Sequence, residues 1–259
     1  MSDSPIDWNT TNAAIWRHHR QALRAVRELD PIRLDGLVGV DRQKKELVRN
    51  TERFLAGRPA NNVLLWGSRG TGKSSLIKAL LNEYAARGLR LIEVDKDDLL
   101  YLPEIVDAIR DLPQRFIVFC DDLSFEAGER NYKALKTVLE GSIELPPRNV
   151  LIYATSNRRH LMPEYMEENR ASGLQDGELH YADSIEEKIS LSDRFGLWLS
   201  FYPSNQDDYL ALVDSYFSDY RGDRGTLHAE ALRFAQTRGG TRSGRTAKQF
   251  YNYFSEDND

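Results

Sequence analysis

The sequence of 259 residues contains a single cysteine, Cys120, so no disulfide can form within the chain. This fits a reducing compartment. The first residues, MSDSPIDWNTTN, include neither the basic start nor the apolar stretch of a signal peptide. The longest purely apolar run, residues 116–120, is about a quarter of what a membrane span needs. We therefore expect a cytoplasmic protein without a membrane segment.

The chain also lacks the basic surplus of a typical polyanion-binding protein. It has 35 Lys and Arg against 40 Asp and Glu, a net charge of −5, so nucleic acid is possible but not favoured as a partner. Residues 16–54 have ten basic and six acidic residues, which we interpret as a solvated helix face rather than a nucleic-acid patch. Residues 160–190 have eight acidic and two basic residues and no clear period, which predicts an exposed insertion. A plain solvated loop is favoured there over a docking site.

Hydrophobic periodicity indicates an α/β protein. Apolar runs at residues 63–66, 91–95, 116–120, 150–154 and 197–201 predict five strands, and helical patterns at 73–87, 99–112 and 128–140 alternate with them. Strands that are continuous apolar runs are typical of a parallel sheet covered by helices on both faces. Gly88 is the expected C-cap of the first of these helices.

Helical patterns alone occur at the two ends of the chain. Residues 12–29 have apolar residues on a rough helical period, ended by Asp30 and Pro31. After Pro203 only helical patterns follow, at 206–220, 226–238 and 244–255. The expected organisation is an N-terminal helical segment (1–32), an α/β core with a five-stranded parallel sheet (33–203) and a small all-helical lid domain (204–259).

Residues 67–74, GSRGTGKS, match the phosphate-binding pattern G-x-x-x-x-G-K-[ST]. They follow an apolar strand and precede a helix, which is the context that this loop requires. The glycines let backbone N–H groups turn toward phosphates, and the helix adds its positive end. Lys73 should reach the β- and γ-phosphates of a nucleotide, and Ser74 should ligate Mg²⁺.

Polar side chains follow two of the other predicted strands. Asp121 and Asp122 come directly after the run 116–120, where a carboxylate of a parallel sheet points into the ligand crevice. We expect Asp121 to hold Mg²⁺ and Asp122 to orient or deprotonate the attacking water, with Glu126 as the alternative for the second role. Asn157 ends the next strand and should hold that water. No role is assigned to Arg158 and Arg159, and Cys120 is expected to be a buried, inert thiol.

The order of these features resembles the AAA+ branch of the P-loop NTPases. In that comparison residues 67–74 correspond to Walker A, Asp121 and Asp122 to Walker B, Asn157 to sensor 1, Arg194 to the arginine finger and Arg245 to sensor 2. Residues 37–41, LVGVD, are similar to the segment that packs on adenine. Residues 186–197 and 243–250 look like those of a bacterial AAA+ family filed as a domain of unknown function. The resemblance covers residues 13–255.

The resemblance implies an ATPase that binds Mg-ATP between core and lid and forms a ring or filament. Arg194 would act on a neighbouring subunit, because we expect the strand 197–201 to lie far from the chain's own phosphate-binding loop. The finger's planar fork suits phosphate oxygens. The nucleotide and metal set so expected is Gly67, Ser68, Arg69, Gly70, Thr71, Gly72, Lys73, Ser74, Ser75, Val38, Gly39, Val40, Arg245 and Asp121, with catalytic roles for Lys73, Asp122, Asn157 and Arg194.

Two departures keep alternatives open. Most AAA+ proteins have Asp-Glu at Walker B, whereas this chain has two aspartates, and its string DDLSF resembles the replication-initiator branch. An ATP-dependent switch or loader with slow hydrolysis, acting on a protein or DNA, is therefore a second hypothesis. No aromatic-hydrophobic-Gly pore loop is present, which disfavours protein threading. A small-molecule kinase is the third hypothesis and would need an acceptor pocket. The five histidines show no metal-ligand spacing, so no metal besides Mg²⁺ is expected.

Overall fold

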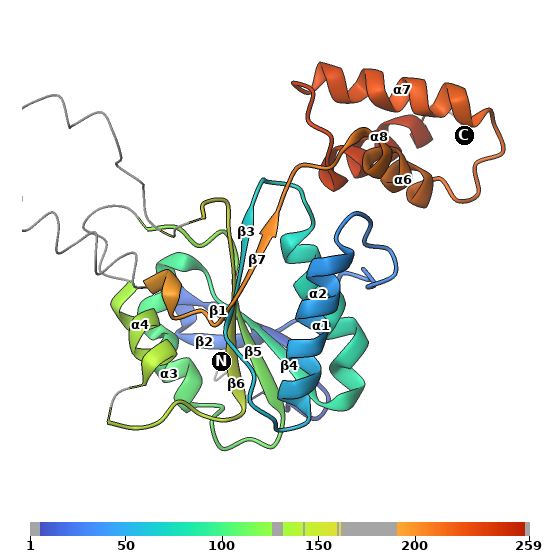
Figure 1. Ribbon diagram of the computed structural model, residues 1–259. Helices are drawn as coiled ribbons and strands as arrows, with labels where there is room; N and C mark the ends of the chain where they lie inside the picture. The colour runs from blue at the N-terminus through green and yellow to red at the C-terminus, as the bar shows by residue number, and fades with distance from the viewer. Residues whose placement is uncertain (1–5, 126–131, 142, 160, 162–190, 257–259) are drawn as a thin grey trace, which may run out of the picture.

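The computed structural model describes residues 6–125, 132–141, 143–159, 161 and 191–256, which form an α/β core followed by a helical domain (Figure 1). Nearly all of the predicted acidic insertion at 160–190 lies outside the described residues. Within the described ranges, no helix has the length and apolar character to cross a membrane.

A seven-stranded sheet in the order β2-β1-β4-β5-β6-β3-β7 forms the centre of the core. The predicted parallel sheet is confirmed, because all five expected strands pair in parallel. The expected number of strands is wrong, since β1 adds in parallel to β4 and β2 adds antiparallel to β1. The five expected strands are β3 (Val63–Gly67), β4 (Leu89–Glu93), β5 (Arg115–Cys120), β6 (Val150–Ser156) and β7 (Leu197–Phe201).

The two additional strands replace the helix predicted at residues 12–29, so the expectation of an N-terminal helical segment is wrong. The chain forms β1 (Ala13–Arg17), a 3-10 turn (His18–Arg20) and β2 (Ala22–Ala25). Ala13 and Ala14 are both buried but belong to core clusters on opposite faces of the sheet. A strand places consecutive side chains on opposite faces, whereas a helix does not. Pairing of β1 with β4 therefore outweighs the helical spacing of the local sequence.

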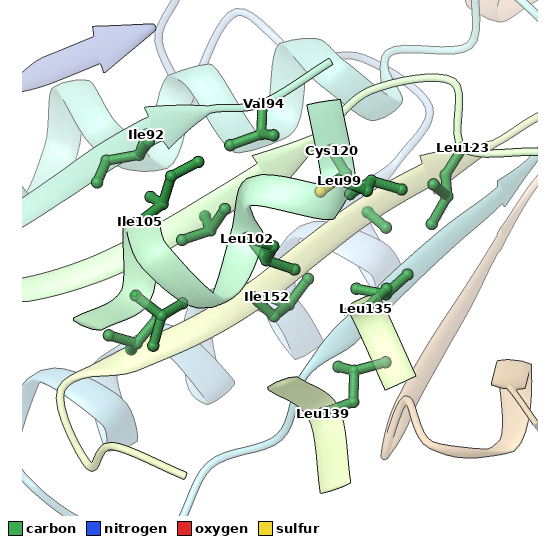
Figure 2. Close-up of a cluster of buried hydrophobic side chains, with 14 of the residues drawn as sticks. Ile92, Val94, Leu99, Leu102, Ile105, Cys120, Leu123, Leu135, Leu139 and Ile152 are labelled. Carbon is green, nitrogen blue, oxygen red and sulfur yellow. The ribbon is translucent and has the colours of Figure 1, made fainter. Parts of the chain in front are cut away.

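Helices cover both faces of the sheet (Figure 1). α1 (Asp41–Leu55) and α2 (Lys73–Tyr84) pack on one face, and α3 (Leu102–Asp107) and α4 (Tyr132–Glu140) on the other. Figure 2 shows the second interface, where leucines of α3 and α4 meet Ile92 and Ile152 of the sheet. Each fully buried aliphatic side chain of this kind contributes about 1.5–3 kcal/mol.

The predicted core helices differ from the observed ones mainly in length. α2 continues as a 3-10 turn (Ala85–Arg87) and ends at Gly88, whose φ of 90° is the left-handed C-cap expected from the sequence. The helix expected at 99–112 is shorter, because a 3-10 turn (Lys96–Tyr101) takes its first part and α3 ends at Asp107. Residues 128–131 of the expected helix 128–140 lie outside the described residues.

Three helices form the C-terminal domain: α6 (Gln206–Tyr216), α7 (Arg224–Thr237) and α8 (Gly244–Glu256). Asn205 and Asp223 cap the first two through their side chains. The domain has its own aromatic-rich core, which includes Tyr209, Phe217 and Phe250. Figure 1 shows it beyond the carboxyl ends of β3 and β7, where ligands bind in open α/β sheets.

Cys120 is fully buried at the end of β5, and burial raises the pKa of its thiol to about 12, with further contributions from Asp95 and Asp121. We expect the native protein to resist a thiol reagent at pH 8, because the reactive thiolate is neither accessible nor formed. Labelling followed by mass spectrometry should show no adduct in native protein and one after denaturation, since the chain has one cysteine. Rapid labelling of the native chain would contradict the buried position of β5.

Candidate nucleotide-binding site

A pocket of about 1070 Å³ lies between the carboxyl ends of the strands and the helical domain. Its volume is slightly above the range of about 300–1000 Å³ that is usual for small-molecule sites. The wall includes the loop after β3, the ends of β5 and β6, residues 36–40, one side of α6 and the first turns of α8. The pocket therefore gathers segments that are far apart in the sequence.

Residues 67–74, here called the P-loop, connect β3 to α2 in a conformation that requires glycine. Gly67 has a φ of 129°, and a Cβ there would lie 2.0 Å from the carbonyl oxygen of Phe201. This close approach lets the Ser68 N–H donate to that same carbonyl at 3.1 Å. Gly70 is also left-handed, and its carbonyl accepts a hydrogen bond from the Gly244 N–H at 3.1 Å. The loop is thus tied to β7 on one side and to the start of α8 on the other.

Lys73 is buried at the first position of α2. Its Nζ donates to the carbonyl oxygens of Gly67 and Ser68, both at 2.7 Å, and to Asn157 Oδ1 at 3.3 Å. Burial lowers the pKa of Lys73; the Arg69 and Arg245 cations also lower it, while Asp121 and Asp122 oppose the shift. An anion bound against Nζ would reverse this shift, so the position favours a negatively charged ligand.

Asp121 and Ser74 both line the pocket and are in direct contact. Asp121 Oδ1 accepts hydrogen bonds from Ser74 Oγ at 2.6 Å and from Thr155 Oγ1 at 2.5 Å. The side-chain atoms of Ser74 and Asp121 that could bind a metal are all oxygens. Oxygen is the ligand type that Mg²⁺ prefers when it keeps part of its water shell and binds a phosphate. The residues present therefore fit a magnesium ion. Among the described residues no cluster of three His, Cys, Asp or Glu side chains offers another metal site.

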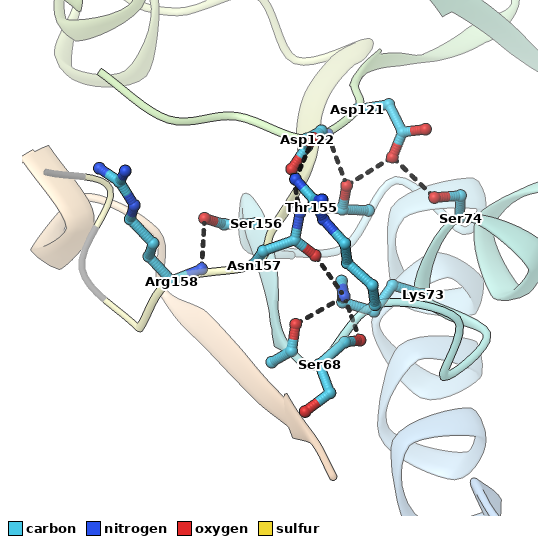
Figure 3. A network of polar contacts seen from close by, with 11 residues as sticks. Ser68, Lys73, Ser74, Asp121, Asp122, Thr155, Ser156, Asn157 and Arg158 are labelled. Atoms are coloured by element: carbon cyan, nitrogen blue, oxygen red, sulfur yellow. Dashed lines mark hydrogen bonds and ion pairs between the residues drawn. The ribbon is translucent and has the colours of Figure 1, made fainter. Parts of the chain in front are cut away.

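Asp122 and Asn157 are in direct contact (Figure 3). Asn157 Nδ2 donates to Asp122 Oδ1, and Asp122 Oδ2 lies 3.8 Å from Arg69 Nη2. Asp122 has a φ of 50°, unusual for a residue other than glycine, and its N–H donates to Thr155 Oγ1 at 2.8 Å. The backbone at the end of β5 is thereby turned so that both aspartates reach the pocket.

Most of the other expected site residues also line this pocket. Val38, Gly39 and Val40 line it, as do Arg245 of α8 and Ser75 of α2. Gly67 and Ser68 contribute the carbonyls that hold Lys73. In Figure 3, Arg158 points away from the cluster, and the Arg159 guanidinium lies 5.7 Å from the centre of the Trp66 ring. Glu126 lies outside the described residues.

Arg194 is not part of this pocket. Its Nε forms an ion pair with Glu140 at the end of α4, and the Arg194 side chain is 17% exposed. The expected reason for its distance from the P-loop is wrong, because β7 pairs directly with β3, with Phe201 opposite Gly67. Arg194 comes three residues before β7, and the P-loop lies beside the last residue of that strand. At the usual rise the five residues of β7 span roughly 16 Å. The separation therefore runs along the strand.

The family model described as "Protein of unknown function (DUF815)" matches residues 9–258. The chain belongs to this family. A segment of 69 residues is 36% identical to the replication factor C large subunit of Staphylothermus marinus. This segment makes up 26% of the present chain and 16% of that subunit.

Solved structures of RuvB from Thermotoga maritima, described as a Holliday junction branch migration motor, have a similar fold. One superposes with a TM-score of 0.56 and 16% identity, covering 86% of this chain and 63% of RuvB. A RuvB mutant superposes with a TM-score of 0.54 and 17% identity, covering 86% of this chain and 65% of the mutant. This DUF815 chain thus spans less than two thirds of RuvB. The expected AAA+ fold is confirmed by this likeness, and the chain that adopts it belongs to the DUF815 family.

Sequence reasoning missed several pocket residues of this DUF815 protein. Thr155 bonds both Asp121 and the Asp122 backbone, and its place beside Asn157 at a strand end was the available signal. Asp208 on α6 approaches Gly39, and its Oδ2 lies 3.3 Å from the position that a Cβ would take there. Nothing in the local sequence connects these two, because they are 169 residues apart. The remaining wall residues that were not expected include Asp30, Lys78, Tyr202, Tyr216 and Lys248.

Proposed function

We propose that this chain binds Mg-ATP between its α/β core and helical domain and hydrolyses it to ADP and phosphate, using the cycle to change the conformation of a partner. One observation carries the proposal. A P-loop lysine, an oxygen pair for Mg²⁺ and a carboxylate–amide pair for a water all open into one pocket. The AAA+ fold of the chain supports the same class of activity.

The mechanism assigns a role to each side chain. Lys73 leaves its carbonyl partners to neutralise the β- and γ-phosphates, and the P-loop N–H groups surround them. Ser74 and Asp121 would hold Mg²⁺, whose positive charge would offset that of the phosphate oxygens. Asn157 and Asp122 hold a water in line with the γ-phosphorus, and Asp122 takes its proton. The catalysis is positioning together with electrostatic stabilisation.

Asp122→Asn should retain ATP and Mg²⁺ binding but lose about 10²–10⁴-fold in turnover, because the amide no longer accepts the proton. Calorimetry and phosphate release measure the two properties separately. Glu126→Gln is the matched comparison, since Glu126 is the other acid near this position in the sequence. If Glu126→Gln is inactive while Asp122→Asn turns over normally, the water-activating role belongs to Glu126.

A switch with slow hydrolysis is the alternative that one contact favours. Asp122 accepts a hydrogen bond from Asn157 on one oxygen and faces Arg69 on the other, so both carboxylate oxygens have neighbours that compete with an attacking water. The partner would then be a protein or DNA bound in the ATP state, rather than one remodelled by each turnover. Single-turnover and steady-state rates decide, because a switch holds ATP for minutes after binding.

Arg245 should contact the γ-phosphate from the same chain and close the helical domain over the nucleotide. It lies one residue after Gly244, whose N–H is bonded to the P-loop, and it lines the pocket. We expect Arg245→Ala to reduce the preference for ATP over ADP about tenfold, the effect of losing one charge-assisted contact. Competition binding with both nucleotides checks this. Equal affinities of the wild type for ATP and ADP would remove the basis of the assignment.

We further propose that Arg194 completes the site of an adjacent subunit in a homo-oligomer. Such a contact joins two different surfaces and therefore builds a ring or a filament. The position of Arg194, outside its own pocket, is compatible with this role. RuvB is described as a Holliday junction branch migration motor and the other relative as a replication factor, and a nucleic-acid partner stays a secondary proposal for this chain.

A further inference from the structure

Arg69 occupies the third position of the P-loop, and its side chain lines the pocket. Its Nη2 lies 3.8 Å from Asp122 Oδ2. The side chains of Arg69 and Asp122 are 73% and 59% exposed, so water screens this ion pair and it contributes little to stability. The guanidinium is therefore near the site without being held firmly in place.

Four side chains form a continuous series of contacts that begins and ends on the P-loop. Lys73 Nζ donates to Asn157, Asn157 donates to Asp122, and Asp122 faces Arg69. Arg69 also lowers the pKa of Lys73 by its charge, although burial is the larger cause. Two cations of one loop thus lie on either side of the carboxylate–amide pair that we assign to the attacking water.

We propose that Arg69 binds the γ-phosphate of ATP on its own chain and stabilises the charge that develops during transfer. This inference rests on the proposed ATPase function. The γ-phosphate has a higher charge than a single carboxylate, so it competes with Asp122 for the guanidinium. The planar fork of arginine pairs two phosphate oxygens at once, which an ammonium group does not do.

The same exchange frees Asp122 for chemistry. When Arg69 moves to the phosphate, Asp122 Oδ2 can accept the proton of the attacking water. The water oxygen then forms a bond to the γ-phosphorus, and the bond from that phosphorus to the β–γ bridging oxygen breaks. ADP leaves with the electron pair, and the proton passes from Asp122 to solvent. Arg69 thereby couples the arrival of ATP to the release of the water-activating carboxylate.

Arg69 differs from the other two arginines assigned to the site. Arg245 belongs to the helical domain and depends on how that domain closes, and Arg194 lies outside the pocket in an ion pair with Glu140. Arg69 needs neither movement of α8 nor a second subunit. In dilute solution we therefore expect only the low turnover that also remains in Arg194→Ala, and this turnover should not depend on protein concentration.

The test measures binding of ADP and of a non-hydrolysable ATP analogue to the wild type, Arg69→Ala, Arg69→Lys and Arg158→Ala. Arg158→Ala is the matched control, because Arg158 follows Asn157 directly but points away from the cluster (Figure 3). We expect Arg69→Ala to lose about tenfold or more in affinity for the analogue and less than about threefold for ADP. Arg69→Lys should recover part of the analogue affinity, and its turnover at saturating ATP should stay about tenfold or more below wild type, because the fork is missing.

Equal losses for both nucleotides, or no loss for either, would overturn the role of Arg69. So would a turnover of Arg69→Ala equal to that of the control at saturating ATP. Failure of the proposed function looks different, because the wild type itself would then not bind the analogue, or Lys73→Ala would bind it as tightly as the wild type. Mixing Arg69→Ala with Asp122→Asn chains adds a third readout. Recovered activity would place Arg69 on a neighbouring site and contradict action within one chain.

Discussion

Lys73→Ala should weaken ATP binding by about 30- to 5000-fold, which corresponds to the roughly 2–5 kcal/mol lost when one partner of a desolvated charge pair is removed. The side chain is 7% exposed, and its Nζ is the cation at the centre of the P-loop. Phosphates bound there would have the loop N–H groups but no cation in contact. Isothermal calorimetry with ATP and Mg²⁺ measures the effect directly.

Two controls make this result interpretable. Lys45→Ala removes a lysine from the exposed side of α1, outside the pocket, and should bind ATP as the wild type does. Protection of Cys120 in the Lys73→Ala variant reports that β5 and the core are intact. Near-normal affinity in a folded Lys73→Ala protein would show that residues 67–74 are a structural turn.

Arg194→Ala should bind ATP normally and lose turnover by up to the 10³–10⁵-fold that arginine fingers supply. The deciding measurement mixes Arg194→Ala with Asp122→Asn subunits, each of which should be inactive alone. A mixed contact then pairs an intact finger with an intact Asp122 site. Recovered ATPase activity supports action across subunits, whereas mixed oligomers that stay inactive at every ratio would exclude it.

The ion pair of Arg194 with Glu140 provides the control for a purely structural role. If Arg194 serves only to hold α4, Glu140→Gln should lower stability and activity as much as Arg194→Ala does. A finger predicts a different outcome, in which Glu140→Gln retains turnover because the guanidinium is still present. Thermal unfolding of both variants, measured without nucleotide, separates the two effects.

Local sequence determined the features that depend on one segment at a time. The apolar runs were long enough to mark β3 to β7, and the P-loop pattern identified Lys73 and Ser74 because its glycines and its lysine lie within eight residues. The strand ends then pointed to Asp121, Asp122 and Asn157. Parallel strands bring their carboxyl ends together, so these positions were expected to meet before the strand order was known.

Contacts between segments were beyond such reasoning. Thr155 reaches Asp121 because β5 and β6 pair with Cys120 opposite Ala154, and that register is a tertiary property. The β1–β2 hairpin was missed because Ala14, Leu23 and Val26 happen to suit a helical period. The Glu140 partner of Arg194 was also missed, since the two residues are 54 positions apart in the sequence.

The β1–β2 hairpin has a consequence for the behaviour of shortened chains. One side of β4 pairs with β5, and the hairpin covers the other, so the outermost strand is β2, four residues long with Arg24 exposed. Short strands with an outward charge resist adding a further strand from another molecule. A chain that lacks residues 1–32 would lose this cover. It would also lose Trp8, whose ring centre lies 4.9 Å from that of Phe116. The bare side of β4 would then offer unpaired N–H and C=O groups to other copies of the chain. Self-association through that strand would therefore follow from removing residues 1–32, which the sequence suggested were an N-terminal helical segment.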